Sequence, residues 1–208
     1  MHENDHERSV VWRRMRIQLA SNSPRRMTML TERYDEVVQR GLRDVDESPP
    51  SGTVDHQVLT ICQRKAAAIA APEPSSVVVV ADTMIADPDD VSLSMGKPRD
   101  LVHAATMLHR LQGRHHQVWT ATGVWSLGEW RFWCESATVA FPEFSHAEMD
   151  HLLQSGSWRG KAGAYDLHGE MGQHATLVDG KACVVLGLAQ SALDRLDDLV
   201  QASGHMSG

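Results

Sequence analysis

The sequence predicts an α/β fold in which helices flank a mixed twisted sheet, with two lobes around a cleft. Three observations predict it. Residues 77–82, VVVVAD, form a β-branched run without alternation, which is typical of a strand buried on both faces. Apolar residues recur at helical spacing over 54–71 and 101–111. Residues 115–126 and 131–141 read as two strands joined by a short turn.

Length and composition allow one domain with a substantial core. The chain has 208 residues, of which 42% are hydrophobic and 23% charged, as in an ordinary globular protein. We expect a loose extension over residues 1–15, a single α/β domain over 16–202 and a tail over 203–208.

Charge and cysteine usage disfavour several classes of partner. The net charge of −7 argues against nucleic acid as a partner. The three cysteines form no C-x-x-C pair, so neither a zinc site nor a disulfide framework is indicated. Because no stretch is long enough to cross a bilayer and the N-terminus lacks a signal-peptide pattern, we expect a cytoplasmic protein without a membrane partner.

The first half of the chain begins with a strand-to-helix junction. Ser23 can cap a helix whose first position is Pro24, where a missing N–H costs nothing. The elements expected in order are a strand at 16–20, a helix from Pro24 to about Arg33, an extended piece near 36–42, a polar loop at 44–52, a helix at about 54–71 and a strand that ends at Asp82.

The second half adds two further capped helices. Asp100 caps the first, and Ser145 with Glu148 forms a capping box for the second. The other expectations are a buried helical stripe of Leu101, Ala104, Leu108 and Leu111, a special glycine-rich loop at 160–173, a hairpin over 174–188 that turns at Asp179 and Gly180, and a last helix that includes 193–200.

Residues 19–26, LASNSPRR, are a candidate anion site. A helix N-terminus offers free N–H groups and partial positive charge, Ser21 and Ser23 add hydroxyls, and Arg25 and Arg26 add planar cationic groups suited to phosphate. The alternative is that Ser-Pro only caps a helix and the arginines are solvated. Composition alone favours this second interpretation.

Four other charged residues are candidates for the same chemistry. Asp82, at the expected end of a buried strand, can hold a divalent cation or take a proton from water. Glu47 is a second candidate metal ligand, and Lys65 and Lys97 are candidate phosphate contacts. Each also has a plain interpretation as a surface or solubilising charge.

Seven segments together resemble a known family. They are LASNSPRR, VDES, RKAAAIA, VVVVADT, GKPRD, LQGRHHQVWTA and KAGAYDLHG. In this order and spacing they are similar to the Maf proteins, nucleoside triphosphate pyrophosphatases, over about residues 15–200. The resemblance implies hydrolysis between the α- and β-phosphates with a divalent metal, Mg²⁺ or Mn²⁺. It also implies a fold like that of the inosine triphosphatases, commonly dimeric.

The resemblance also implies roles for individual residues. Asp82 matches the proton acceptor, and Arg25 and Thr83 match the branch that acts on dTTP and UTP. His168 stands where that branch has glutamine, whose amide presents a donor and an acceptor together, unlike imidazole. The positions that match the polar lining of the phosphate and metal site are Ser21, Arg26, Glu47, Lys65 and Lys97.

Three functional hypotheses follow. The first is a pyrophosphatase for dTTP or UTP. The second is a pyrophosphatase for modified or purine nucleotides, which His168 favours. The third is a nucleotide-binding regulator of cell division with little turnover. The adjacent His115 and His116 are not expected to share a metal ion, because neighbouring residues of a strand face opposite ways.

Overall fold

A computed structural model describes residues 15–205 except 71, 74, 166 and 168–169. Its centre is a seven-stranded mixed sheet with the order β2-β1-β3-β5-β6-β7, in which β4 also pairs with β3. The strands are β1 (Ile17–Leu19), β2 (Val37–Gln39), β3 (Val77–Ala86), β4 (Ser94–Met95), β5 (His115–Ser126), β6 (Glu129–Ala140) and β7 (Thr176–Asp179).

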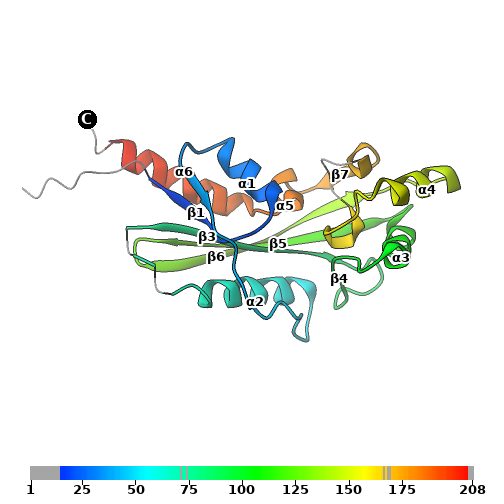
Figure 1. Ribbon diagram of the computed structural model, residues 1–208, viewed down its shortest axis with the longest axis horizontal. Coiled ribbons are helices and arrows are strands. Elements are labelled where there is room, and N and C mark those ends of the chain that lie inside the picture. The colour runs from blue at the N-terminus through cyan, green and yellow to red at the C-terminus, as the bar shows by residue number, and fades with distance from the viewer. Residues whose placement is uncertain (1–14, 71, 74, 166, 168–169, 206–208) are drawn as a thin grey trace, which may run out of the picture.

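Helices cover both faces of this sheet, which confirms the predicted fold class (Figure 1). The helices are α1 (Pro24–Thr31), α2 (Val54–Ala67), α3 (Leu101–Leu111), α4 (His146–Ser155), α5 (Ala182–Leu186) and α6 (Gln190–His205). Two 3₁₀ turns, Ala162–Ala164 and Glu170–Gln173, lie in the glycine-rich loop. Helix α2 lies on one side of the sheet, whereas α1, α5 and α6 lie on the other (Figure 1).

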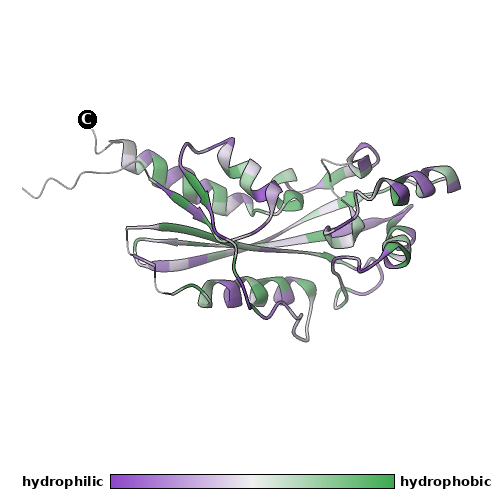
Figure 2. Ribbon diagram, viewed as in Figure 1, coloured by the Kyte–Doolittle hydropathy of each residue, from purple (hydrophilic) through white to green (hydrophobic). Residues whose placement is uncertain are grey.

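The core follows from the alternation of side chains along β3. Val78 and Val80 pack with Ile61 of α2, while Val79 packs on the opposite face with α1 and α6. A third apolar cluster joins the end of β3, at Ile85, to α3 and α4. Hydrophobic residues accordingly concentrate in the sheet and in the helices beside it (Figure 2).

One edge of β3 is shared by two short strands. Strand β1 runs parallel to β3 up to Leu19, opposite Val79, whereas β4 runs antiparallel and pairs Met95 with Ile85. The carboxyl ends of β1 and β4 therefore point toward each other along this edge. The stretch of β3 between their pairings, residues 80–84, contains Asp82 and Thr83. We call it the β3 gap.

The local helix signals are confirmed. The Ser23 side chain accepts a hydrogen bond from the backbone N–H of Arg26, and Asp100 caps α3. Ser145 and Glu148 form the expected capping box at α4. Helix α6 reaches His205 and so covers the start of the segment we predicted as a tail.

Three expectations are wrong. Strand β3 does not end at Asp82 but continues to Ala86, because β5 pairs with it antiparallel beyond that point. Leu101 is half exposed, and Met107 joins the buried stripe of α3 in its place. The predicted hairpin at 174–188 is a single edge strand followed by α5, because Gly187 in a left-handed conformation ends a helical turn there.

Candidate active site

The segment after β1 brings the Ser21 hydroxyl and the Arg26 guanidinium to the β3 gap. Ser21 accepts a hydrogen bond from the backbone N–H of Ser23 (3.2 Å) just before α1 begins. Arg26, in the first turn of α1, points inward and is only 9% exposed. Its Nη1 donates to Ser21 Oγ (3.1 Å) and its Nη2 to Thr83 Oγ1 (3.0 Å). Arg26 is therefore part of the interior, not a solvated surface arginine.

A second group of charges lies on the other face of β3. Lys65 of α2 donates from Nζ to Asp82 Oδ1 at 2.7 Å and lies 3.3 Å from Glu47 Oε1. The Lys65 and Asp82 side chains are nearly buried, whereas that of Glu47 is exposed. Lys65 thus neutralises two carboxylates that would otherwise repel each other.

The neighbouring Cys62 thiol adds no charge to this cluster. Cys62 donates weakly from Sγ to the carbonyl oxygen of Val80 (3.8 Å). Burial, and then the nearby Asp82 carboxylate, raise the pKa of Cys62 to about 12. The thiol therefore stays protonated at neutral pH and is not a nucleophile.

The Arg26 group and the Lys65–Asp82 group lie on opposite faces of β3, on either side of the β3 gap. Asp82 and Thr83 are consecutive, so their side chains leave the strand on opposite faces, toward Lys65 and Arg26 respectively. Burial lowers the pKa of Arg26, and the Asp82 carboxylate opposes that effect, so the two charges interact. A ligand at the gap can reach cationic and acidic groups together, because β1 and β4 leave this edge of β3 free between their pairings.

Comparison with known proteins decides the family. A family model described as "Maf-like protein" matches residues 16–197, which is most of the chain. The chain belongs to the Maf-like proteins.

Curated relatives agree with this family. The Maf-like chain is 32% identical over 183 residues to a dTTP/UTP pyrophosphatase of Bacillus velezensis, covering 83% of this chain and 90% of the relative. It is 34% identical over 194 residues to a dTTP/UTP pyrophosphatase of Salinibacter ruber, covering 89% and 93%. A solved structure of the Staphylococcus aureus Ham1 protein aligns with a TM-score of 0.42 at 13% identity, over 61% of this chain and 71% of that one.

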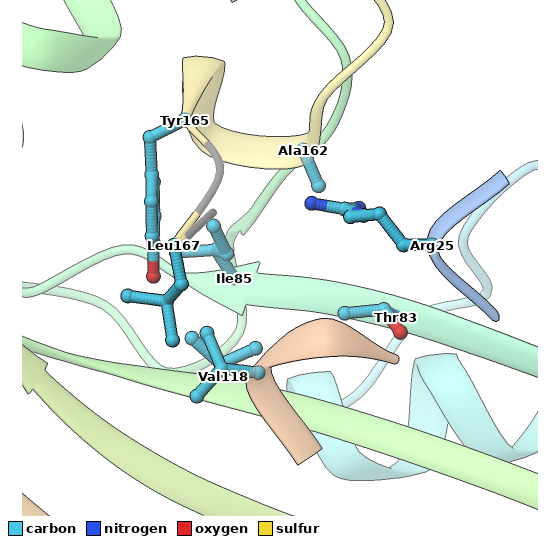
Figure 3. A pocket seen from close by; sticks show the side chains of 8 residues that line it. Arg25, Thr83, Ile85, Val118, Ala162, Tyr165 and Leu167 are labelled. Carbon is cyan, nitrogen blue, oxygen red and sulfur yellow. The ribbon is translucent and has the colours of Figure 1, made fainter. Parts of the chain in front are cut away.

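A pocket of the Maf-like chain adjoins the gap on the Arg26 face. Arg25 extends across it toward Ala162, with Thr83 on its floor (Figure 3). Apolar side chains of its wall lie beside the cationic end of Arg25. The lining residues are Arg25, Thr83, Ile85, Val118, Ala162, Tyr165, Leu167 and Val185.

A buried histidine supports one wall of this pocket. His116 Nε2 lies 2.9 Å from Tyr165 Oη, and its Nδ1 has no hydrogen-bond partner among the described residues. Burial lowers the pKa of His116 to about 4, so the ring is neutral at pH 7. His115, next to it, is exposed, as the alternation of a strand predicts.

The other site residues predicted from sequence are placed differently. Lys97 follows Gly96 just after β4, so its backbone approaches the gap, but its side chain is exposed. His168 lies outside the described residues. Within the described residues, no three His, Cys, Asp or Glu side chains form a ready metal cluster.

Sequence reasoning missed two residues of the site. Thr120 Oγ1 lies 2.8 Å from Thr83 Oγ1 and donates to the carbonyl oxygen of Val184 (2.7 Å). The carbonyl oxygen of Gly187 accepts from Arg26 Nε at 2.8 Å. A threonine within a strand and a glycine near a chain turn carry no local signal of such contacts.

Proposed function

We propose that this Maf-like chain hydrolyses a nucleoside triphosphate to the monophosphate and pyrophosphate, with dTTP and UTP as its favoured substrates. The observation that carries the proposal is the β3 gap, which sets the Arg26 guanidinium and the Asp82 carboxylate on either side of one strand edge. The names of the relatives support the same reaction and the same bases.

In this proposal the triphosphate lies along the gap and the base enters the adjoining pocket. Ser21, Arg26 and the first turn of α1 bind phosphate oxygens, and Arg25 approaches them from the pocket side. No helix of the described residues is long and apolar enough to cross a membrane. We propose a cytoplasmic location, where nucleotide substrates are found.

The proposed reaction consumes one water. Its oxygen adds to the α-phosphorus, the bond from that phosphorus to the bridging oxygen breaks, pyrophosphate leaves with the bridging oxygen, and Asp82 accepts a proton of the water. The Asp82 Oδ2 atom suits this role because Lys65 occupies only Oδ1, and no described residue donates to Oδ2. Lys65 and Arg26 stabilise the charge that develops on the departing pyrophosphate.

A divalent cation fits this donor set. Asp82 and Glu47 present carboxylate oxygens that converge on Lys65, and substrate phosphates would complete the oxygen ligands that Mg²⁺ and Mn²⁺ prefer. When bound, the ion would supply charge neutralisation and orient the water. Glu47 and Asp82 are the residues that we propose to hold it.

A substrate panel tests the proposal. Purified protein is incubated with canonical and modified nucleoside triphosphates, with Mg²⁺ or Mn²⁺, and released pyrophosphate is measured. We expect the highest kcat/KM for dTTP and UTP. A preference for purine or modified bases would support the alternative that His168 favours, and tight binding without pyrophosphate release would support a regulator.

A further inference from the structure

A chain of hydrogen bonds leads from Arg26 away from the gap into the core. Arg26 Nη2 lies 3.0 Å from Thr83 Oγ1, Thr83 Oγ1 lies 2.8 Å from Thr120 Oγ1, and Thr120 Oγ1 lies 2.7 Å from the carbonyl oxygen of Val184. The two threonines are direct partners in the β3–β5 register. This chain therefore crosses from α1 through two strands to α5.

The direction of each bond follows from counting protons. A threonine hydroxyl has one proton to donate, and that of Thr120 goes to the Val184 carbonyl, which can only accept. The Thr83 proton must then go to Thr120, and Thr83 accepts from Arg26. The Thr83 hydroxyl consequently has no proton left for a substrate.

The Nε edge of the Arg26 guanidinium is held by Gly187, the residue directly after α5. Arg26 Nε donates to the carbonyl oxygen of Gly187, and Gly187 adopts φ +116, a conformation that favours glycine. A Cβ there would lie only 2.9 Å from Arg26 Nε. The segment 184–187 thus holds Arg26 twice, directly through the Gly187 carbonyl and indirectly from the Val184 carbonyl through the two threonines.

We propose that Thr120 is a positioning residue that orients Arg26 through Thr83, and that the Thr83 hydroxyl acts through Arg26 and not by donating to the substrate. The proposal rests on the proposed function. Arg26 uses three of its five N–H groups on Ser21, Thr83 and Gly187. The other two N–H groups, one on Nη1 and one on Nη2, have no partner among the described residues. Because the guanidinium is planar, the three bonded N–H groups fix the direction in which these two point.

Three variants test the role of Thr120. Thr120→Val keeps the shape and removes the hydroxyl, Thr120→Ser restores the hydroxyl, and Thr122→Val is the matched control. Thr122 is on the same strand, is equally buried, and accepts from the backbone N–H of Ala189, so its loss loosens the same segment without breaking the chain to Arg26.

We expect Thr120→Val to lower kcat/KM for dTTP about tenfold or more, mainly through kcat, and to weaken binding of inorganic pyrophosphate by a similar factor. Thr120→Ser should recover most of both losses. Thr122→Val should lower thermal stability about as much as Thr120→Val, with less than a threefold change in kcat/KM or pyrophosphate binding.

Two outcomes would overturn the proposal. One is that Thr122→Val and Thr120→Val reduce kcat/KM and pyrophosphate binding equally, which would show that loosening of α5 is the cause. The other is that Thr120→Val binds pyrophosphate as wild type does. A wild-type protein that releases no pyrophosphate from any nucleotide would refute the proposed function, and the pyrophosphate-binding series would still test Thr120 separately.

Discussion

Asp82 and Asp87 are two nearly buried carboxylates, 8% and 6% exposed, in one short stretch of chain. Arg110 binds both oxygens of Asp87, and the backbone N–H of Asp89 donates to Oδ1 as well. Asp82 is bound by Lys65 through Oδ1, and Oδ2 has no hydrogen-bond donor among the described residues. Burial alone therefore does not identify a reactive carboxylate; the number of lone pairs already used does.

The largest expected effect is the loss of activity when Asp82, whose Oδ2 has no hydrogen-bond donor among the described residues, is replaced. Asp82→Asn removes the proton acceptor and should lower kcat/KM for pyrophosphate release about 10²- to 10⁴-fold. Lys65 still faces Glu47 in this variant, so the fold should be retained. Circular dichroism checks the fold, and Asp87→Asn is the control, whose activity per folded molecule should equal that of wild type. Equal activity losses in Asp82→Asn and Asp87→Asn would show that the two carboxylates do not differ in their role in catalysis.

The buried, neutral His116 extends the comparison of the buried carboxylates Asp82 and Asp87. His116 has a folded pKa of about 4, against about 6.5 for an unfolded histidine, so the unfolded chain binds more protons between these values. Its contribution to stability is complete above about pH 6.5 and is lost as the pH falls toward 4, by about 3 kcal/mol.

The measurement for His116 is urea unfolding between pH 7 and pH 4. Wild type should lose about 3 kcal/mol more over this interval than His116→Phe, which keeps the ring contacts with Phe141 and Tyr165. Parallel pH curves for the two proteins would show that His116 is not held neutral by burial.

Asp87→Asn should destabilise the fold by about 1–3 kcal/mol, because it replaces a charge-assisted pair with a weaker contact. Hydrogen bonds from Arg110 lower the pKa of Asp87. The stability that this supplies is present above the ordinary carboxyl pKa of about 4 and is lost as the pH falls below it. The difference in unfolding free energy between wild type and variant should therefore shrink in acid. A difference independent of pH would contradict this account.

The smallest effect is expected at Asp89. Its exposed carboxylate pairs with Arg114 and Arg110 at the surface, where water and salt screen such pairs. Asp89→Asn should shift the urea midpoint less than Asp87→Asn, and the shift should vanish in high salt. A shift as large as that of Asp87→Asn would mean that exposure does not separate the two sites.

Local signals in the sequence predicted the helix starts well. The caps at Ser23, Asp100 and Ser145 depend on residues only a few positions away, so the sequence contains all the information that they need. The residue at which β3 ends and the secondary structure of residues 182–186 depend instead on tertiary contacts. Strand β5 extends β3 past Asp82, and a short apolar run such as ACVVL fits strand and helix equally.

The same division applies to the candidate site. Ser21, Ser23, Arg25, Arg26 and Asp82 could be singled out because their types suit phosphate and metal chemistry, whereas Thr83 was predicted only through the family resemblance. The partner of Arg26 at Gly187 is 161 positions away, and Thr120 meets Thr83 only through strand register. Such contacts depend on topology, which neither spacing nor composition contains.

The division of one strand edge between β1 and β4 also links substrate binding to the stability of the fold. The two strands come from distant parts of the chain and run in opposite directions beside β3. The site at the β3 gap is therefore complete only when both strands have paired with β3, so binding requires contacts between distant parts of the chain. Substrate bound there should stabilise the folded protein by an amount that rises with the logarithm of the free substrate concentration once that concentration exceeds Kd.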